Sequence, residues 1–217
     1  MDSHVKDVMT RDVVSVRGTA EYKDILAVMR ELHVSAFPVL DAADHVVGVV
    51  SEEDLLLKEC GQEALAGYLI VSGRRGEHAK AAGVTAAELM SKPPVTIGPE
   101  DTVAGAARLM HDRRVKRLPV VDDAGRLVGI VSRVDVLSVF DRPDDEIRDQ
   151  VIKDNVEAEF ALDPDALDVT VSSGIVTVTG RVESRTLAPA LIEAIRHAEG
   201  VVDVRDRLSI PRRTKPS

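Results

Sequence analysis

Two copies of a glycine, serine and aspartate pattern contain the residues best suited to bind a ligand. Residues 48–54 and 129–135 both read Gly-x-x-Ser-x-x-Asp. Each serine hydroxyl could donate to a phosphate oxygen, and each aspartate could accept from both hydroxyls of a ribose. A helix beginning after the serine would add backbone N–H groups that favour phosphate, and the glycine would let a ligand approach the backbone. The candidate nucleotide-binding residues are therefore Ser51, Asp54, Ser132 and Asp135.

The same spacing also has a purely structural explanation. Ser-x-x-Asp resembles a capping box, in which the serine caps the first turn of a helix and the acidic side chain caps back. A serine cap of this kind is worth about 1 kcal/mol without any ligand. Both explanations stay open for each copy of the pattern.

Charge distinguishes the two copies. In the second copy, Lys116 and Arg117 precede an apolar strand and Arg133 directly follows the serine. Three cations suit a phosphate chain, and arginine offers a forked pair of donors. The equivalent residues of the first copy are Ser35, Ala36 and Glu52, with Glu53 next in the chain. We therefore expect the main nucleotide site at the second copy, around Asp135, although a solvated surface cluster is the alternative for the two cations that precede the strand.

The other reactive side chains form no pattern typical of a catalytic or metal site. The six histidines include no pair four residues apart and have no cysteine at ligand spacing, so no zinc site is predicted. The usual phosphate-loop, dinucleotide, nucleophile-elbow and zinc-protease motifs are missing from the sequence. We expect a protein that is not an enzyme, with no catalytic residues, no metal and no required cofactor.

Composition narrows the partners and the compartment. The net charge is −9, and both the first 140 residues and the remainder are acidic, so no nucleic-acid partner is expected. Two tyrosines and three phenylalanines are too few for a base-stacking surface. The single cysteine, Cys60, fits a reducing compartment, and no apolar run approaches the length of a membrane span. We expect a cytoplasmic protein.

An internal repeat positions the two copies. When the sequence is shifted by 81 residues, 7–56 align with 88–137 without a gap. Each unit predicts a short strand (13–16 or 95–97), a helix (21–32 or 102–113), two apolar strands (37–40 and 46–50, or 118–121 and 127–131) and a second helix. The continuous apolar character of the second strand of each pair predicts burial on both faces. One unit is marginally stable alone, so the two are expected to share a core.

These residues resemble a pair of CBS domains, known together as a Bateman module. The resemblance covers most of 5–140 and rests on three duplicated motifs: Met9-Thr10 and Met90-Ser91, an apolar-Pro-Val at 37–39 and 118–120, and the Gly-x-x-Ser-x-x-Asp pattern. It implies two repeats packed around a pseudo-twofold axis, with clefts that hold an adenine nucleotide or S-adenosylmethionine. It also implies a homodimer shaped as a disk. The resemblance suggests that adenine lies against Pro94, Val95 and Ile97.

The last third of the chain has a different pattern, α-β-β-α-β. A helix is predicted over about 144–159, with Ile152, Val156 and Phe160 on one face, followed by a hairpin that turns at Ser173 and Gly174. A second helix and a strand over 201–210 complete it. The segment 144–210 resembles a BON domain through its Gly-apolar stretches at 174–180 and 200–204. BON domains are associated with phospholipid surfaces or other macromolecules, so the partner implied is a protein or a phospholipid.

The sequence thus predicts an α+β protein: CBS repeats at 1–57 and 85–140, a connector at 58–84, a BON domain at 144–210 and a basic tail at 211–217. Arg74 and Arg75 in the connector could reach a phosphate or keep a loop solvated. The basic residues at the end of the chain could bind anionic lipid or be solvated; they are Arg205, Arg207, Arg212, Arg213 and Lys215.

The leading hypothesis is a non-enzymatic sensor of AMP, ADP or ATP that relays occupancy to the BON domain. The alternatives are a ligand-independent dimeric scaffold that binds an envelope component or phospholipid, and an S-adenosylmethionine sensor.

Overall fold

The computed structural model describes residues 3–57, 83–182 and 184–210 and divides into two compact units. One unit is His4–Arg133 and the other begins at Val134. Several residues that the sequence singled out lie outside the described ranges: Cys60, Arg74, Arg75, Arg212, Arg213 and Lys215. Among the described residues, no helix is both long enough and apolar enough to cross a membrane.

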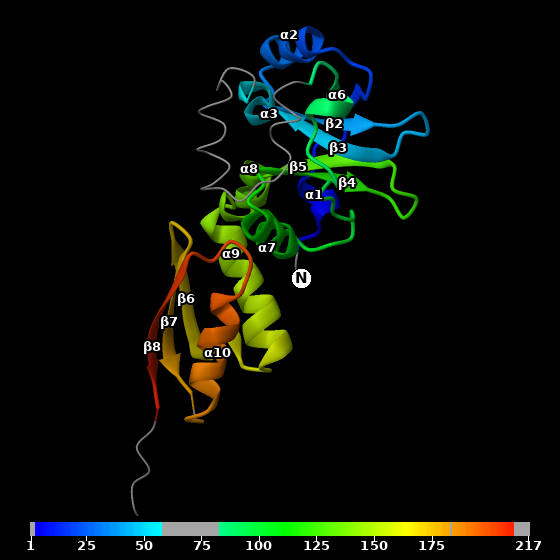
Figure 1. The fold of residues 1–217 in the computed structure, drawn as a ribbon. Helices are drawn as coiled ribbons and strands as arrows, with labels where there is room; N and C mark the ends of the chain where they lie inside the picture. The colour runs from blue at the N-terminus through cyan, green and yellow to red at the C-terminus, as the bar shows by residue number, and fades with distance from the viewer. Residues whose placement is uncertain (1–2, 58–82, 183, 211–217) are drawn as a thin grey trace, which may run out of the picture. The chain divides into compact units, whose positions relative to one another are not determined.

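The first unit contains the two repeats as far as Arg133 (Figure 1). The first repeat is formed by α1 (Val5–Val8), β1 (Val16–Arg17), α2 (Tyr22–Leu32), β2 (Ala36–Leu40), β3 (Val46–Ser51) and α3 (Glu52–Leu56). The second is formed by α6 (Ala86–Leu89), α7 (Val103–Arg113), β4 (Arg117–Val121), β5 (Leu127–Ser132) and α8 (Arg133–Leu137). The division between the units falls inside α8.

The hairpins and long helices of both repeats lie where the sequence predicts them, but three details differ. The helices α1 and α6 were not predicted, because one turn is too short to show helical periodicity. The first predicted strand of each repeat is shorter than expected: the strand at 13–16 is observed as Val16–Arg17, and that at 95–97 is reduced to a single bridge between Ile97 and Val120. The prediction that β3 and β5 are buried on both faces was wrong: burial alternates along both strands, as it does in an antiparallel hairpin with one covered face.

Hydrogen bonds between the repeats follow a pseudo-twofold relation. The backbone N–H of Val5 donates to the carbonyl of Asp101 at 2.8 Å, and that of Ala86 donates to Ala20 at 2.8 Å. Ala86 lies 81 residues after Val5, and Ala20 lies 81 residues before Asp101, so the two bonds join equivalent positions in exchanged repeats. Each repeat therefore lends its first helix to the other, as Figure 1 shows for α6 beside β2 and α1 beside the green strands of the second repeat.

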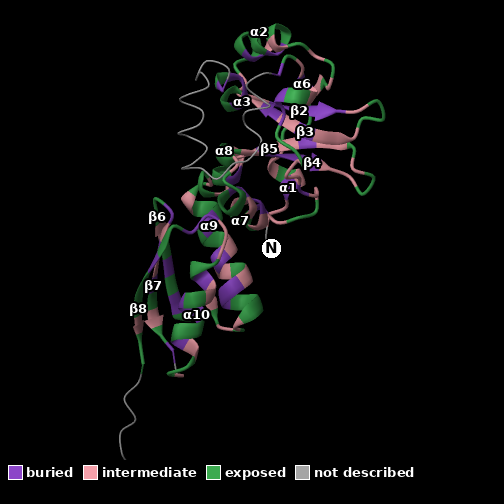
Figure 2. Ribbon diagram, in the orientation of Figure 1, coloured by how far each residue is buried: buried purple, intermediate pink, exposed green. Residues whose placement is uncertain are grey.

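The core of the first repeat confirms this exchange. Ile25, Phe37 and Val50 are fully buried, and they share one hydrophobic cluster with Leu89 of the second repeat. Leu89 is itself fully buried. Figure 2 shows the purple buried positions along β2 and β3, where α6 covers them. The two repeats thus share a core, as their small size predicts.

Matching turns close the two hairpins. The Asp41 carboxylate accepts from the backbone N–H of His45 and Ala43, and these bonds lower the pKa of the carboxyl below its ordinary value. The backbone N–H of Arg126 does the same for the pKa of Asp122, 81 residues later. The turns are therefore held by the same local chemistry in both repeats.

The second unit packs two helical segments on one face of a three-stranded sheet (Figure 1). Its elements are a 3-10 turn (Ser138–Phe140), α9 (Asp144–Gln150), a π-helix (Val151–Glu159), a second 3-10 turn (Pro164–Ala166), β6 (Leu167–Ser172), β7 (Ile175–Arg181), α10 (Leu187–Arg196) and β8 (Asp203–Ser209). The order is β6-β7-β8, with β7 antiparallel to β6 and parallel to β8. Ser173 and Gly174 adopt φ angles of 53° and 72°, as a tight hairpin turn requires.

One helical face in this unit was predicted incorrectly. The sequence predicted Ile152, Val156 and Phe160 as the buried row, whereas the buried apolar residues are Ile147, Val151 and Val156. Ile152 and Phe160 are only partly buried. The buried row instead runs through Ile147, Val151 and Asn155, with Val156 beside it, so the predicted row is offset from the buried one by one residue.

Candidate functional site

The first Ser-x-x-Asp pattern forms a capping box. Ser51 is the N-cap of α3, and its backbone N–H and hydroxyl both donate to Oδ2 of Asp54, at 2.8 and 2.7 Å. The Ser51 oxygen in turn accepts from the backbone N–H of Asp54 at 3.4 Å. The only proton of the hydroxyl is therefore directed at Asp54, and donation to a phosphate would require this bond to break.

A residue of the other repeat also binds this aspartate. The hydroxyl of Ser91 donates to Oδ1 of Asp54 at 3.3 Å, so both carboxylate oxygens accept hydrogen bonds from the protein. Asp54 is only 6% exposed. Hydrogen bonds to a charged group are worth about 1.5–3 kcal/mol each. A ribose that approached Asp54 would compete with these bonds, and the exposed Glu52 and Glu53 beside it would repel the phosphates of a nucleotide.

The second pattern occupies the equivalent elements of its repeat. Ser132 ends β5 and is paired with Arg117 across the hairpin, and Asp135 lies in the first turn of α8. Asp135 is half-buried, in contrast to Asp54.

The three predicted cations gather at one end of the β4–β5 hairpin, but two of them already have protein acceptors. Arg117 donates to the Ser35 hydroxyl of the first repeat at 2.7 Å. Arg133 donates to the carbonyl of Val115 through Nε at 3.3 Å and through a terminal nitrogen at 3.1 Å. Lys116 is exposed, and its carbonyl accepts from the backbone N–H of Arg133 at 3.1 Å. The cluster is cationic and solvent-facing, as phosphate recognition requires.

The residues suggested for adenine contact differ in how accessible they are. Pro94 and Val95 are half-buried, so part of each side chain can meet a ligand. Ile97 is 6% exposed and belongs to the sheet of the second repeat, where its N–H donates to Pro119 at 3.1 Å and its carbonyl accepts from Val121 at 2.9 Å. Its contribution to a ligand site would therefore be small.

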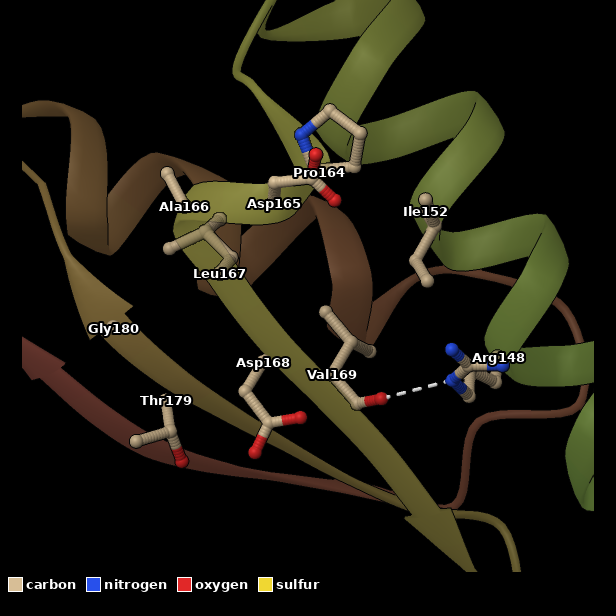
Figure 3. Close-up of a pocket in the computed structure, with 10 residues that line it drawn as sticks. All are labelled: Arg148, Ile152, Pro164, Asp165, Ala166, Leu167, Asp168, Val169, Thr179 and Gly180. Atoms are coloured by element: carbon tan, nitrogen blue, oxygen red, sulfur yellow. Dashed lines mark hydrogen bonds between the residues drawn. The ribbon is translucent and has the colours of Figure 1, made fainter.

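A surface depression of about 530 Å³ lies in the second unit, and none of the predicted nucleotide residues lines it (Figure 3). Asp165, Asp168 and Thr179 line it, together with Arg148 from α9. The Nε of Arg148 donates to the carbonyl of Val169 at 3.1 Å, which Figure 3 shows as a dashed line. This arginine is used to hold the helix against the β6 edge. Across the described ranges, no three histidine, cysteine or carboxylate side chains gather in a way that could hold a metal ion.

Comparison with known proteins identifies two domain families in the chain. The CBS domain family matches residues 5–59 and 86–142, and the BON domain family matches 144–212. An uncharacterised protein of Methanopyrus kandleri is 32% identical over 135 residues, 62% of this chain and 61% of that protein. The inosine-5'-monophosphate dehydrogenase of Korarchaeum cryptofilum is 30% identical over 126 residues, 58% of this chain but only 22% of the enzyme. The chain thus spans less than two thirds of either relative.

A solved structure with a bound nucleotide resembles the CBS part of the chain. CBSX2 of Arabidopsis thaliana, crystallised in complex with AMP, aligns with a TM-score of 0.54 at 30% sequence identity. The alignment covers 62% of this chain and 94% of CBSX2. The similarity confirms the α+β class predicted for the repeats.

Proposed function

The chain belongs to the CBS domain family, and from this premise we propose that it is a non-enzymatic regulatory protein that binds an adenine nucleotide through the second repeat. The observation that carries the proposal is the gathering of Lys116, Arg117 and Arg133 around Ser132 at one end of the β4–β5 hairpin. Asp135 would accept from the ribose, and Pro94 and Val95 would meet the base, with a small contribution from Ile97. The AMP complex of the related CBSX2 supports this ligand class.

Thermal unfolding with AMP, ADP, ATP and S-adenosylmethionine tests the proposal. A ligand at about 100 times its Kd stabilises a protein by about 2.7 kcal/mol, so each nucleotide should raise the midpoint, and more phosphates should raise it further. The double variant Lys116→Ala/Arg133→Ala should abolish the gradation with phosphate count. The matched control is Lys23→Ala/Arg30→Ala, which removes two exposed cations from α2.

The remaining outcomes of this experiment separate the rival functions. If only S-adenosylmethionine stabilises the protein, and does so equally in the double variant, the chain would be a sensor of a methyl donor and not of adenine nucleotides. No stabilisation by any of the four compounds would contradict nucleotide binding and favour a scaffold.

The relay, the assembly and the compartment are further parts of the proposal. Nucleotide occupancy would change the presentation of the BON domain to a partner, which requires the ligand to bind one arrangement of the protein better than another. The family resemblance suggests a homodimer. Leu56 and Leu137, which occupy equivalent positions in the two repeats, are 61% and 59% exposed and are candidates for its interface. The single cysteine supports a cytoplasmic location.

A second candidate function, the phospholipid-binding scaffold, is favoured by the charge on the open face of the BON sheet. Arg181, Arg205 and Arg207 alternate with helix-facing residues along β7 and β8, and all three are exposed. The exposed carboxylates on the same face are Asp168 and Asp203, so three arginines face two aspartates there. At both edges of the sheet, side chains already bind backbone groups that an added strand would need. Asp203 and Asp206 accept from the backbone N–H groups of Val204 and Leu208 at 2.8 Å, and Arg148 covers the Val169 carbonyl of β6. A partner would therefore meet the open face more readily than it would add a strand.

Sedimentation with vesicles tests this second function. Wild-type protein should sediment with vesicles of phosphatidylcholine and phosphatidylglycerol, and Arg205→Glu/Arg207→Glu should lose most of the bound fraction, since each basic residue near an anionic surface is worth about 1 kcal/mol. Lys153→Glu/Arg196→Glu makes the same change of charge at exposed helical positions and should bind like the wild type. Equal losses in both variants would contradict a role for the sheet face.

A further inference from the structure

The guanidinium of Arg117 is anchored to the first repeat. One of its terminal nitrogens donates to the hydroxyl of Ser35 at 2.7 Å, and both residues are half-buried. The Arg117 side chain makes no other hydrogen bond and no ion pair with any of the described residues. Arginine carries several N–H donors in a rigid, planar fork, so most of them stay available to a phosphate. The positive charge of Arg117 is therefore held in one place without being neutralised.

Ser35 itself has a fixed backbone. It lies between α2 and β2, and its carbonyl accepts from the backbone N–H of Glu52, the first residue of α3, at 3.0 Å. Lys116 occupies the equivalent place in the second repeat, where its carbonyl accepts from the N–H of Arg133 at 3.1 Å. The bond from Arg117 to Ser35 thus joins matching ends of the two hairpins, and its acceptor is tied to the start of α3.

The sequence allows this bond on one side of the pseudo-twofold axis only. At the 81-residue offset, Ser35 and Arg117 correspond to Lys116 and Ala36. The methyl group of Ala36 has no donor, so the reverse bond cannot form.

An arginine that is already held near its bound position loses less conformational freedom when it binds a phosphate, and the affinity rises accordingly. We propose that Ser35 is a positioning residue that holds Arg117 ready for the phosphates of a nucleotide at the second repeat. This inference rests on the proposed function, because it adds a residue of the first repeat to the same site.

Titration calorimetry with ATP on the full chain tests this role. Ser35→Ala should weaken ATP binding by about 3- to 10-fold, the effect of losing one hydrogen bond that positions a side chain. Ser35→Thr, which keeps the hydroxyl, should retain most of the affinity. Arg117→Ala should bind ATP about 10- to 100-fold more weakly, and adding Ser35→Ala to it should cause no further loss. The control Ser209→Ala removes a hydroxyl that donates to the Gly180 carbonyl in the second unit, and it should bind like the wild type.

The outcomes distinguish this inference from the proposed function. If Ser35→Ala binds ATP as tightly as the wild type, or more tightly, the positioning role is overturned while nucleotide binding stands. If Ser35→Ala weakens binding by the same factor with and without Arg117, Ser35 acts by another route and the role is again overturned. If the wild type binds no ATP, both proposals fail.

Discussion

Replacing Asp135 with alanine is expected to lower the affinity for AMP by about 10- to 100-fold, because hydrogen bonds to a charged acceptor contribute about 1.5–3 kcal/mol. The unfolding free energy should fall by less than in Asp54→Ala, since Asp135 is half-buried whereas Asp54 is only 6% exposed. The effect should therefore appear mainly in the Kd.

The equivalent change in the first repeat should have the opposite consequence. Asp54→Ala removes a buried carboxylate that accepts from the backbone N–H and hydroxyl of Ser51 and from the hydroxyl of Ser91, while the Ser51 oxygen can still accept from the backbone N–H of residue 54. Loss of the bonds to the carboxylate should cost about 2–4 kcal/mol of unfolding free energy, since a hydrogen bond to a charged group is worth about 1.5–3 kcal/mol. Affinity for AMP should stay close to that of the wild type.

Calorimetric titration and thermal unfolding of both variants check this crossed pattern. Asp168→Ala, which removes an exposed carboxylate from the BON sheet, controls for the change in net charge and should alter neither quantity much. Equal losses of affinity in the Asp135 and Asp54 variants, or a loss only in the latter, would contradict the assignment of the nucleotide to the second repeat.

The repeat made much of the fold predictable from sequence. The 81-residue offset that aligns the two copies also relates their strand registers, down to the irregularity after Val39 and after Val120. The exchange of first helices was not predictable in the same way. The helices α1 and α6 have four residues each, too few to show periodicity. The repeat that each of them covers is decided by contacts between segments far apart in the sequence.

The candidate site was predictable in its composition but not in its bonding. The residues of the second pattern and the three cations lie next to one another along the backbone of the β4–β5 hairpin, and their use in binding a nucleotide stays a prediction. The bond from Arg117 to Ser35 and that from Ser91 to Asp54 join residues that are 82 and 37 positions apart, and no local pattern indicates them. The one available signal was the polar residue that follows methionine in both Met9-Thr10 and Met90-Ser91. The contact that this polar residue makes is visible only in the structure, where Thr10 pairs with Ile130 of the second repeat and Ser91 pairs with Val49 of the first.

Leu89→Ala is expected to destabilise the first unit by about 2–5 kcal/mol, the usual cost of removing a buried leucine side chain and leaving a cavity. Leu89 belongs to the second repeat by sequence, yet its fully buried side chain packs with Ile25 and Phe37 of the first. If the repeats share one core, the change should lower hydrogen-exchange protection in β2 and β3 as well as in β4 and β5.

Exchange measured by mass spectrometry separates a shared core from two autonomous repeats. Leu56→Ala, at a position 61% exposed, is the matched control and should change stability by about 0.5 kcal/mol or less. Amides of β7 and α10 should keep their protection, because the second unit has a separate hydrophobic cluster. Loss of protection confined to the second repeat would contradict the shared core. A shared core also makes one repeat sensitive to changes in the other, which a sensor needs if a single nucleotide is to alter the whole CBS pair.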